Sequence, residues 1–102
     1  MIEDRFWYWH HKLGYLFGLI FERRYKRIKL IFCSDTDSDN IGLSWRSSNT
    51  IELNITHITE DNLDEVIVHE LCHLIAPEEE NDHGEEWQRC MKLAGFKPKE
   101  II

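Results

Sequence analysis

Three histidines and one glutamate in the second half of the chain have the types and the spacing of a metal-binding site. The run HELCH occupies positions 69–73, which places His69 and His73 four residues apart, and His83 opens the run HGEEW at positions 83–87. Side chains four residues apart lie on the same face of a helix, so two imidazoles there can each direct one nitrogen at the same ion. Three protein ligands and an open position for water are the usual arrangement around catalytic zinc.

Glu70 is the residue of this group that suggests catalysis as well as binding. It follows His69 directly, and a step of one residue turns the side chain by about 100° around the helix axis, so Glu70 stands beside the ion rather than on it. A carboxylate in that position can take a proton from a metal-bound water. The sequence therefore predicts His69, His73 and His83 as metal ligands and Glu70 as the catalytic base. Four acidic residues between the second and third histidines are alternatives to His83 as the third ligand: Glu78, Glu79, Glu80 and Asp82.

Residues next to these ligands are expected to support them. Trp87 lies four residues after His83, on the same helical face, so we expect it to pack against the HELCH helix and to hold His83 in place. Cys72 is one position from His73, so it faces away from the ion as a small buried thiol. Met91 either lines the floor under the metal or belongs to the core.

Three helices are predicted around this motif. Apolar residues recur at three- and four-residue steps over 3–26, which indicates a first helix. A second helix, which carries HELCH, is expected from an N-cap at Thr59 to a stop at Pro77. The last helix is expected over 84–94, with Gly95 just past its end.

Strands are predicted between the first helix and the HELCH helix. A first strand is expected over 28–33, and alternating residues over 41–45 and 51–55 indicate a hairpin with one buried face. The order helix, three strands, helix, helix defines an α+β fold with a small three-stranded sheet. On the first hairpin strand, the side chains expected on the buried face are those of Ile41, Leu43 and Trp45.

Length and charge limit the classes of protein that this chain can be. It has 102 residues and a formal net charge of −7, so we expect a single domain over residues 1–102 without a uniformly basic nucleic-acid surface. Basic residues cluster at the end of the first predicted helix, where they either complement the helix dipole or contact phosphate, with Trp7, Tyr8 and Tyr15 as stacking faces. This cluster consists of Arg23, Arg24, Lys26, Arg27 and Lys29.

The sequence gives no sign of a membrane or secretory protein. The longest apolar run, over 13–21, has nine residues, whereas a membrane span needs about 20. The start of the chain is acidic, unlike the basic beginning of a secretory signal. Three widely spaced cysteines fit neither a disulfide framework nor a paired zinc-binding motif, so we expect free thiols and a cytoplasmic location.

These motifs resemble those of the SprT-like, or Spartan-type, family of zinc metalloproteases. The resemblance rests on the HELCH helix with its acidic start, on HGEEW in the next helix, on the Ile-Glu-Leu-Asn strand at positions 51–54, and on the long first helix. It implies a zincin-like fold, zinc bound by His69, His73 and His83, and Glu70 as the base of an endopeptidase. The family's better-known members cleave proteins crosslinked to DNA. Their Cys-x-x-Cys zinc ribbon and basic tail have no counterpart in this sequence.

Two hypotheses for the function follow from the sequence. The first is an endopeptidase whose extended polypeptide substrate adds as a strand to an exposed sheet edge near Gly42–Trp45. The second is a non-catalytic zinc module that binds a protein or DNA partner, in which a fourth protein ligand would close the metal site.

Overall fold

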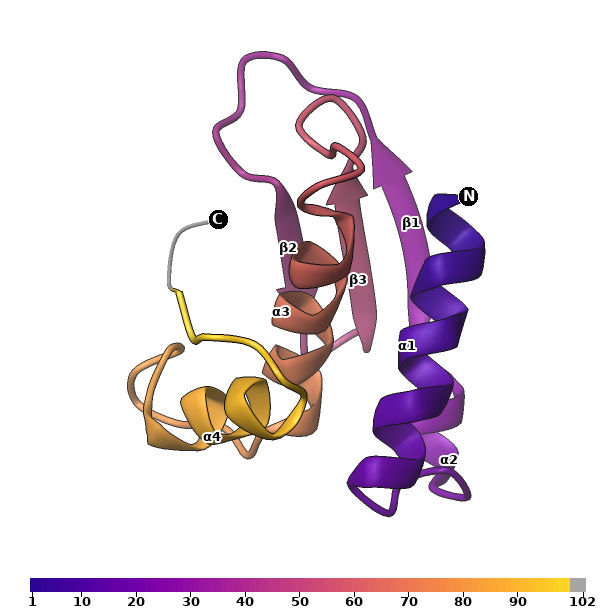
Figure 1. Cartoon of the computed structure of the whole chain (residues 1–102), viewed down its shortest axis with the longest axis vertical. Helices are drawn as coiled ribbons and strands as arrows, with labels where there is room; N and C mark the ends of the chain where they lie inside the picture. Colours follow the sequence, from indigo (N-terminus) through magenta and orange to yellow (C-terminus); the bar gives the residue numbers. More distant parts are fainter. Residues whose placement is uncertain (100–102) are drawn as a thin grey trace.

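The computed structural model describes residues 1–99 as a three-stranded sheet with helices packed on one of its faces. The helices are α1 (Ile2–Leu16), the single-turn α2 (Arg23–Lys26), α3 (Leu63–Ile75) and α4 (Glu85–Leu93). The strands are β1 (Lys29–Cys33), β2 (Gly42–Trp45) and β3 (Thr50–Asn54). Figure 1 shows α3 in front of the sheet, with α1 on one side of it and α4 on the other. The predicted α+β class is confirmed.

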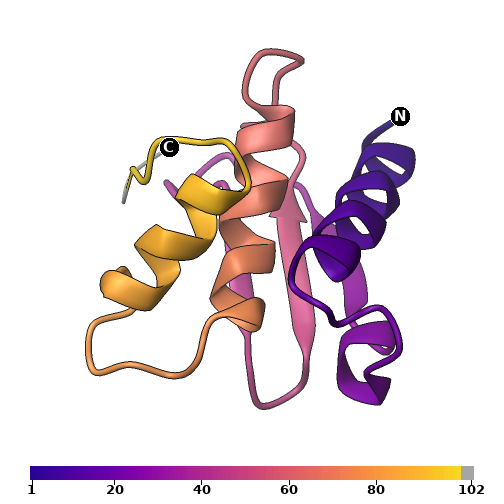
Figure 2. The same ribbon diagram turned by 60° about the horizontal axis from the view of Figure 1, so that its bottom comes forward.

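The sheet has the order β1-β3-β2, so β3 is central and β2 is an edge strand. β2 and β3 form the predicted antiparallel hairpin, in which Ser44 pairs with Ile51. β1 pairs with β3 in parallel, with Leu30 opposite Ile51, a direction that the alternating pattern did not reveal. Figure 2 shows the strands together behind the helices.

The face that β2 turns towards the helices is the opposite of the one predicted. Leu43 and Trp45 are 37% and 41% exposed, whereas Ser44 lies on the helix side and hydrogen-bonds Glu70 of α3. The prediction of a buried face with Ile41, Leu43 and Trp45 was therefore wrong for the two strand residues. The reason is tertiary, because the pairing with β3 places Ser44 on the face of Ile51, which is the face that α3 covers.

The first predicted helix is interrupted. α1 ends at Leu16, and Gly18 adopts a left-handed φ of +70° that a helix cannot continue through. The amide of Leu19 bonds the carbonyl of Gly14 at 2.7 Å and the amide of Gly18 bonds that of Tyr15 at 3.2 Å, which together form a Schellman cap. A single helix over 3–26 was thus a wrong prediction.

α3 begins later than Thr59 and ends where expected. Thr59 and Asn62 form a reciprocal turn, in which the amide of Thr59 donates to Asn62 Oδ1 at 2.8 Å and the amide of Asn62 donates to Thr59 Oγ1 at 3.2 Å. The helix itself starts at Leu63, with Asn62 as its N-cap. Ala76 is extended, as the residue before Pro77 must be, so the helix stops at Ile75.

α3 is the centre of the packing. It contacts α1, β2 and α4, and its residues from Val66 to Cys72 are buried. α4 ends at Leu93 with Gly95 at a φ of +97°, as predicted for a glycine just past the helix end. None of the helices in the described part of the chain has the length and apolar character needed to cross a membrane. The fully buried large side chains are Trp87, Phe6, Leu13, Ile51, Leu53, Ile67, Leu71 and Met91.

Candidate metal centre

The three predicted histidine ligands come together between α3 and the segment before α4. His69 Nε2 lies 3.2 Å from His73 Nε2 and 3.4 Å from His83 Nε2. Zinc-bound nitrogens stand about 2.0–2.1 Å from the ion, and tetrahedral geometry then separates them by about 3.3 Å. Within residues 1–99, these three residues are the group of potential metal ligands whose donor atoms converge. The donor set and its spacing therefore fit a tetrahedral metal ion.

Two of these imidazoles are held in the neutral form that binds metal. Burial, followed by the neighbouring His73 and His83, lowers the pKa of His69 to about 3. Burial and His83 likewise lower the pKa of His73 to about 4. Since a metal binds the lone pair of a neutral imidazole, these two ligands are available at neutral pH without losing a proton.

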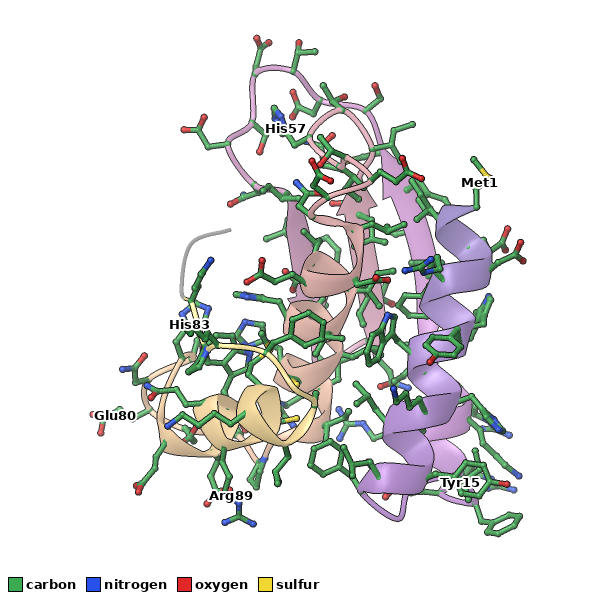
Figure 3. The ribbon with its side chains drawn as sticks, in the orientation of Figure 1. Met1, Tyr15, His57, Glu80, His83 and Arg89 are labelled. Carbon is green, nitrogen blue, oxygen red and sulfur yellow. The ribbon has the colours of Figure 1, made fainter. Side chains whose placement is uncertain are left out.

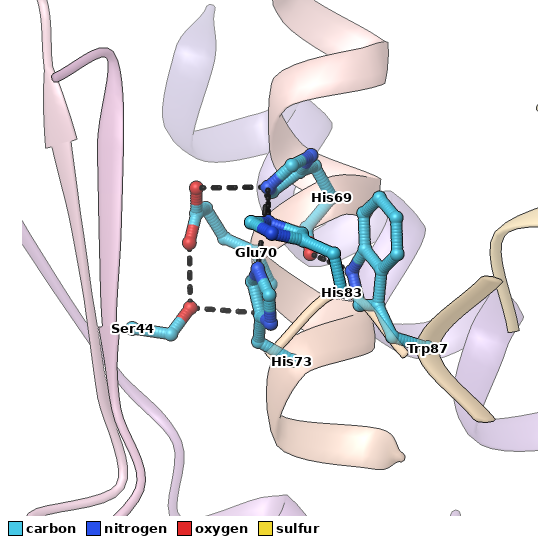
Figure 4. A network of polar contacts seen from close by, with 6 residues as sticks. All are labelled: Ser44, His69, Glu70, His73, His83 and Trp87. Atoms are coloured by element: carbon cyan, nitrogen blue, oxygen red, sulfur yellow. Dashed lines mark hydrogen bonds and ion pairs between the residues drawn. The ribbon is translucent and has the colours of Figure 1, made fainter. Parts of the chain in front are cut away.

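Trp87 joins α3, which carries two of the histidines, to α4, which follows the third. Its indole nitrogen donates a hydrogen bond of 3.2 Å to the main-chain carbonyl of His69, and its ring lies 4.6 Å from that of His83, centre to centre. Figure 4 shows the indole against the histidine cluster. The expected packing of Trp87 on the HELCH helix is confirmed. Met91 is fully buried and does not line the pocket at the cluster, so it belongs to the core.

Glu79, one of the acidic alternatives to His83 as the third ligand, caps a helix instead. Its carboxylate accepts hydrogen bonds from the amides of Glu86 at 3.1 Å and Trp87 at 3.4 Å, so it caps the N-terminus of α4. A Cβ on Gly84 would lie 2.8 Å from this carboxylate, which explains the glycine directly after His83. The other three acidic alternatives do not join the converging group: Glu78, Glu80 and Asp82.

Glu70 lies between the histidine cluster and the sheet. Its Oε2 stands 4.0 Å from His69 Nε2, and its Oε1 accepts a hydrogen bond of 2.7 Å from the Ser44 hydroxyl (Figure 4). The side chain is buried, and burial raises its pKa to about 7, with the Ser44 hydrogen bond acting in the opposite sense. In the metal-free protein, burial therefore favours the protonated form of this carboxyl group.

β2 and the residue that follows it, Arg46, contribute three contacts to the site that the sequence did not suggest. Ser44 bonds Glu70, and a Cβ on Gly42 would lie 2.9 Å from Glu70 Cγ. Arg46 donates hydrogen bonds to the carbonyls of His73 at 2.7 Å and Ala76 at 2.5 Å, so it caps the end of α3. The sequence did not predict these contacts because the apolar residues of β2 indicated that its other face is buried.

The cluster opens into a pocket of about 380 Å³. Its walls are β2, the end of α3 and the loop before α4, and β2 is the edge strand of the described sheet. Figure 3 shows His83 beside α4 on this side of the molecule and His57 in a different region, near the far end of the sheet. An extended chain lying along the β2 edge would pass the histidine cluster.

The predicted basic cluster lies on α2 and the start of β1, on the side of α3 away from α4 (Figures 1 and 2). Phe21 is 86% exposed there, and it lines a hollow of about 340 Å³ together with Arg23, Lys26 and Arg27. Arg24 is engaged differently, because it donates to the carbonyl of Arg46 at 2.5 Å. The cluster is therefore a surface separate from the histidine site.

Comparison with known proteins gives one match. The model of the SprT-like family matches residues 6–101, which is nearly the whole chain. No curated protein and no solved structure matches the chain significantly.

Proposed function

The chain belongs to the SprT-like family, and on that premise we propose that it is a zinc-dependent endopeptidase. In this proposal His69, His73 and His83 hold the ion and Glu70 is the catalytic base. The observation that carries it is the convergence of three imidazole nitrogens beside a buried carboxylate. His69 Nε2 lies 3.2 Å from that of His73 and 3.4 Å from that of His83. Three protein ligands leave one tetrahedral position for water or substrate, which is the usual arrangement at catalytic rather than structural zinc.

The residues that would hold zinc are suited to it. Neutral imidazole nitrogens are common zinc ligands, and three of them match the donor count of known hydrolytic sites. Zinc in this position supplies Lewis-acid activation of a water molecule and of the scissile carbonyl.

Glu70 performs the proton transfers in the proposed reaction. Its Oε2 faces the histidine cluster, so this oxygen takes the proton of the attacking water as the water oxygen bonds to the peptide carbonyl carbon. The same oxygen then delivers the proton to the leaving amine nitrogen as the C–N bond breaks. Burial keeps the carboxylate away from competing bulk water during both transfers.

The substrate in this proposal is an extended polypeptide segment. Within residues 1–99, β2 bonds another strand only on its β3 side, and an added strand would satisfy the backbone groups of the other edge. Such a strand lies along the pocket wall beside Glu70.

We propose the cytoplasm as the compartment of this protein. The free thiols of Cys33, Cys72 and Cys90 fit its reducing conditions.

The test is cleavage of an unfolded protein substrate by zinc-loaded wild type and by Glu70→Gln. We expect wild type to cleave it, the variant to lose about 10²-fold or more of the rate, and both to bind zinc equally. Equal rates for the two proteins would remove Glu70 from the reaction. A crystal structure with zinc separates the alternative of a non-catalytic module, because a fourth protein side chain on the ion would support that module.

A second proposal concerns DNA as a partner. Arg23, Lys26 and Arg27 surround the exposed Phe21, with Lys26 Nζ 5.7 Å from the centre of its ring, and cations beside an exposed aromatic ring suit a single strand. We expect salt-dependent binding of single-stranded DNA that is lost on the double charge reversal Arg23→Glu/Arg27→Glu. The double reversal Arg89→Glu/Lys92→Glu on α4 changes the net charge equally and is the matched control. Equal loss of binding in it would argue against a specific surface.

A further inference from the structure

We infer that Ser44 is a positioning residue for the general base, holding one oxygen of Glu70 so that the other faces the metal site. The inference rests on the proposed function. Ser44 lies on β2 with its Oγ 2.7 Å from Glu70 Oε1 and 2.9 Å from the Glu70 main-chain oxygen. Figure 4 shows this hydroxyl on the sheet side of Glu70 and the histidines on the other.

The two carboxylate oxygens of Glu70 have different surroundings. Oε1 accepts from Ser44, whereas Oε2 stands 4.0 Å from His69 Nε2. Among the described residues, Ser44 is the donor that the carboxylate has. Without it, no hydrogen bond within residues 1–99 fixes the torsion of the carboxyl group, and that torsion is intrinsically broad for Glu. The hydrogen bond therefore selects Oε2 as the oxygen directed at the reaction.

This arrangement works before and after the proton transfer. An ionised carboxylate accepts at both oxygens, and a protonated one still accepts at the oxygen without the proton. If the proton is taken up on Oε2, the hydroxyl of Ser44 continues to donate to Oε1. The base is thus held in one orientation through the reaction.

Gly42 provides the space in which Glu70 is held. It lies two residues before Ser44 on the same face of β2, and a Cβ on Gly42 would come within 2.9 Å of both Glu70 Cγ and Oε2. A gap below 3 Å requires a shift of the side chain or the strand. Hence the strand proposed to receive the substrate along its edge also positions the base, through a glycine and a serine that alternate with exposed Leu43.

The variants that test the inference are Ser44→Ala, Ser44→Thr and, as a control, Ser47→Ala. Ser47 lies in the exposed turn of the same hairpin. We expect Ser44→Ala to lower kcat about 10- to 100-fold with KM and zinc affinity unchanged. Ser44→Thr keeps the hydroxyl and should recover most of kcat, and Ser47→Ala should match wild type. If Ser44→Ala also raises KM, weakens zinc binding or lowers the stability of the fold, the role of Ser44 is merely structural and the inference is overturned.

A double-mutant comparison adds a readout that a general weakening of the fold would not give. Ser44→Ala should have no further effect in the Glu70→Gln background, because a positioning residue acts only through the group that it positions. An equal loss in both backgrounds would contradict the inference.

A crystal structure of zinc-loaded Ser44→Ala separates this inference from the proposed function. We expect Glu70 Oε2 to leave its place beside the histidines, whether or not the protein cleaves a substrate. An unmoved carboxylate would overturn the inference while leaving the endopeptidase proposal intact. Conversely, if wild type has no peptidase activity but Glu70 is displaced in the variant, the proposed function is wrong and the inference about Ser44 stands.

Discussion

The indole nitrogen of Trp87 donates its hydrogen bond to the main-chain oxygen of His69, 3.2 Å away, and so links α4 to the residue that begins the metal motif. Both residues are buried. The bond lies between the helix that carries the first two histidines and the helix that follows the third. The position of His83 relative to the other two histidines therefore depends on how α4 docks against α3.

Replacing Trp87 with Phe should measure this link. Phe keeps an aromatic ring, but the indole donor to the His69 carbonyl is lost and the smaller ring leaves a cavity at a buried site. These two losses together cost about 1 to 3 kcal/mol. We expect urea denaturation of the metal-free protein to show that loss, and zinc affinity to fall as well. Trp7→Phe is the control, since Trp7 is 39% exposed. Equal midpoints for the Trp87 variant and wild type would contradict the importance of the bond.

His83→Ala should separate a three-ligand site from a two-ligand site. We expect zinc affinity to fall by more than about 100-fold, beyond the loss typical of mutating an outer-shell partner. His11→Ala, at an exposed position of α1, should bind zinc like wild type. Calorimetric titration with zinc measures both. Full affinity without His83 would show that another residue supplies the third ligand.

Glu70→Gln should stabilise the metal-free protein at pH 8. The pKa of Glu70 is raised from 4.5 to about 7, so the native state holds the proton more tightly than the unfolded state and loses stability as pH rises through this interval. An uncharged glutamine escapes that cost, which is about 1 to 3 kcal/mol. Urea denaturation at pH 8 and at pH 4.5 should show the gain only at pH 8. Glu60→Gln, an exposed control, should show no gain at either pH.

The metal-free protein should lose stability as pH falls from 6.5 to 4.5. The pKa values of His69 and His73 lie near 3 and 4 when folded, so in this range the unfolded chain binds two protons that the native state does not. Glu70 opposes this with one proton bound in the native state, and burial of His10 adds to the loss. The slope is about 1.4 kcal/mol per pH unit for each net proton.

This pH dependence can be measured by urea denaturation in the presence of a chelator. The double variant His69→Asn/His73→Asn should show a much flatter dependence, because its two substituted side chains do not titrate. A wild-type stability that increases between pH 6.5 and 4.5 would reverse the predicted sign and show that Glu70 outweighs both histidines.

Glu79→Ala should destabilise α4 by removing its N-terminal cap. Two amide donors lose their partner, at a typical cost of about 1 kcal/mol. Because His83 lies directly before this helix end, zinc affinity should fall too. Glu80→Ala removes an equal charge from an exposed neighbour and is the matched control. If both variants bind zinc alike, the effect of Glu79 is one of net charge rather than capping.

The ligand set could be proposed from the sequence because its geometry is largely local. His69 and His73 share a helix, and spacing within a helix fixes their relative direction. Glu70 beside them and Trp87 four residues after His83 follow from the same periodicity. The ends of α3 and α4 were also predictable, since Pro77 and Gly95 act on the backbone next to them.

The break after α1 was harder to predict because two glycines stand in its pattern. Gly14 stays within the helix, whereas Gly18 adopts the left-handed conformation that ends it. Their difference comes from the surroundings. A Cβ on Gly14 would lie 3.0 Å from the side chain of Tyr25, whereas a Cβ on Gly18 would have no atom of another segment within 4 Å.

The sequence alone determined the candidate metal ligands and the two helices beside them, because helical periodicity and caps act over a few residues. Only the tertiary structure decided which face of β2 meets α3, and hence that Ser44, Gly42 and Arg46 join the site. Alternation gives two faces but does not say which one a helix covers, since that depends on strand pairing and on packing between segments far apart in the chain. Glu79 was likewise placed by the docking of α4 and not by its charge.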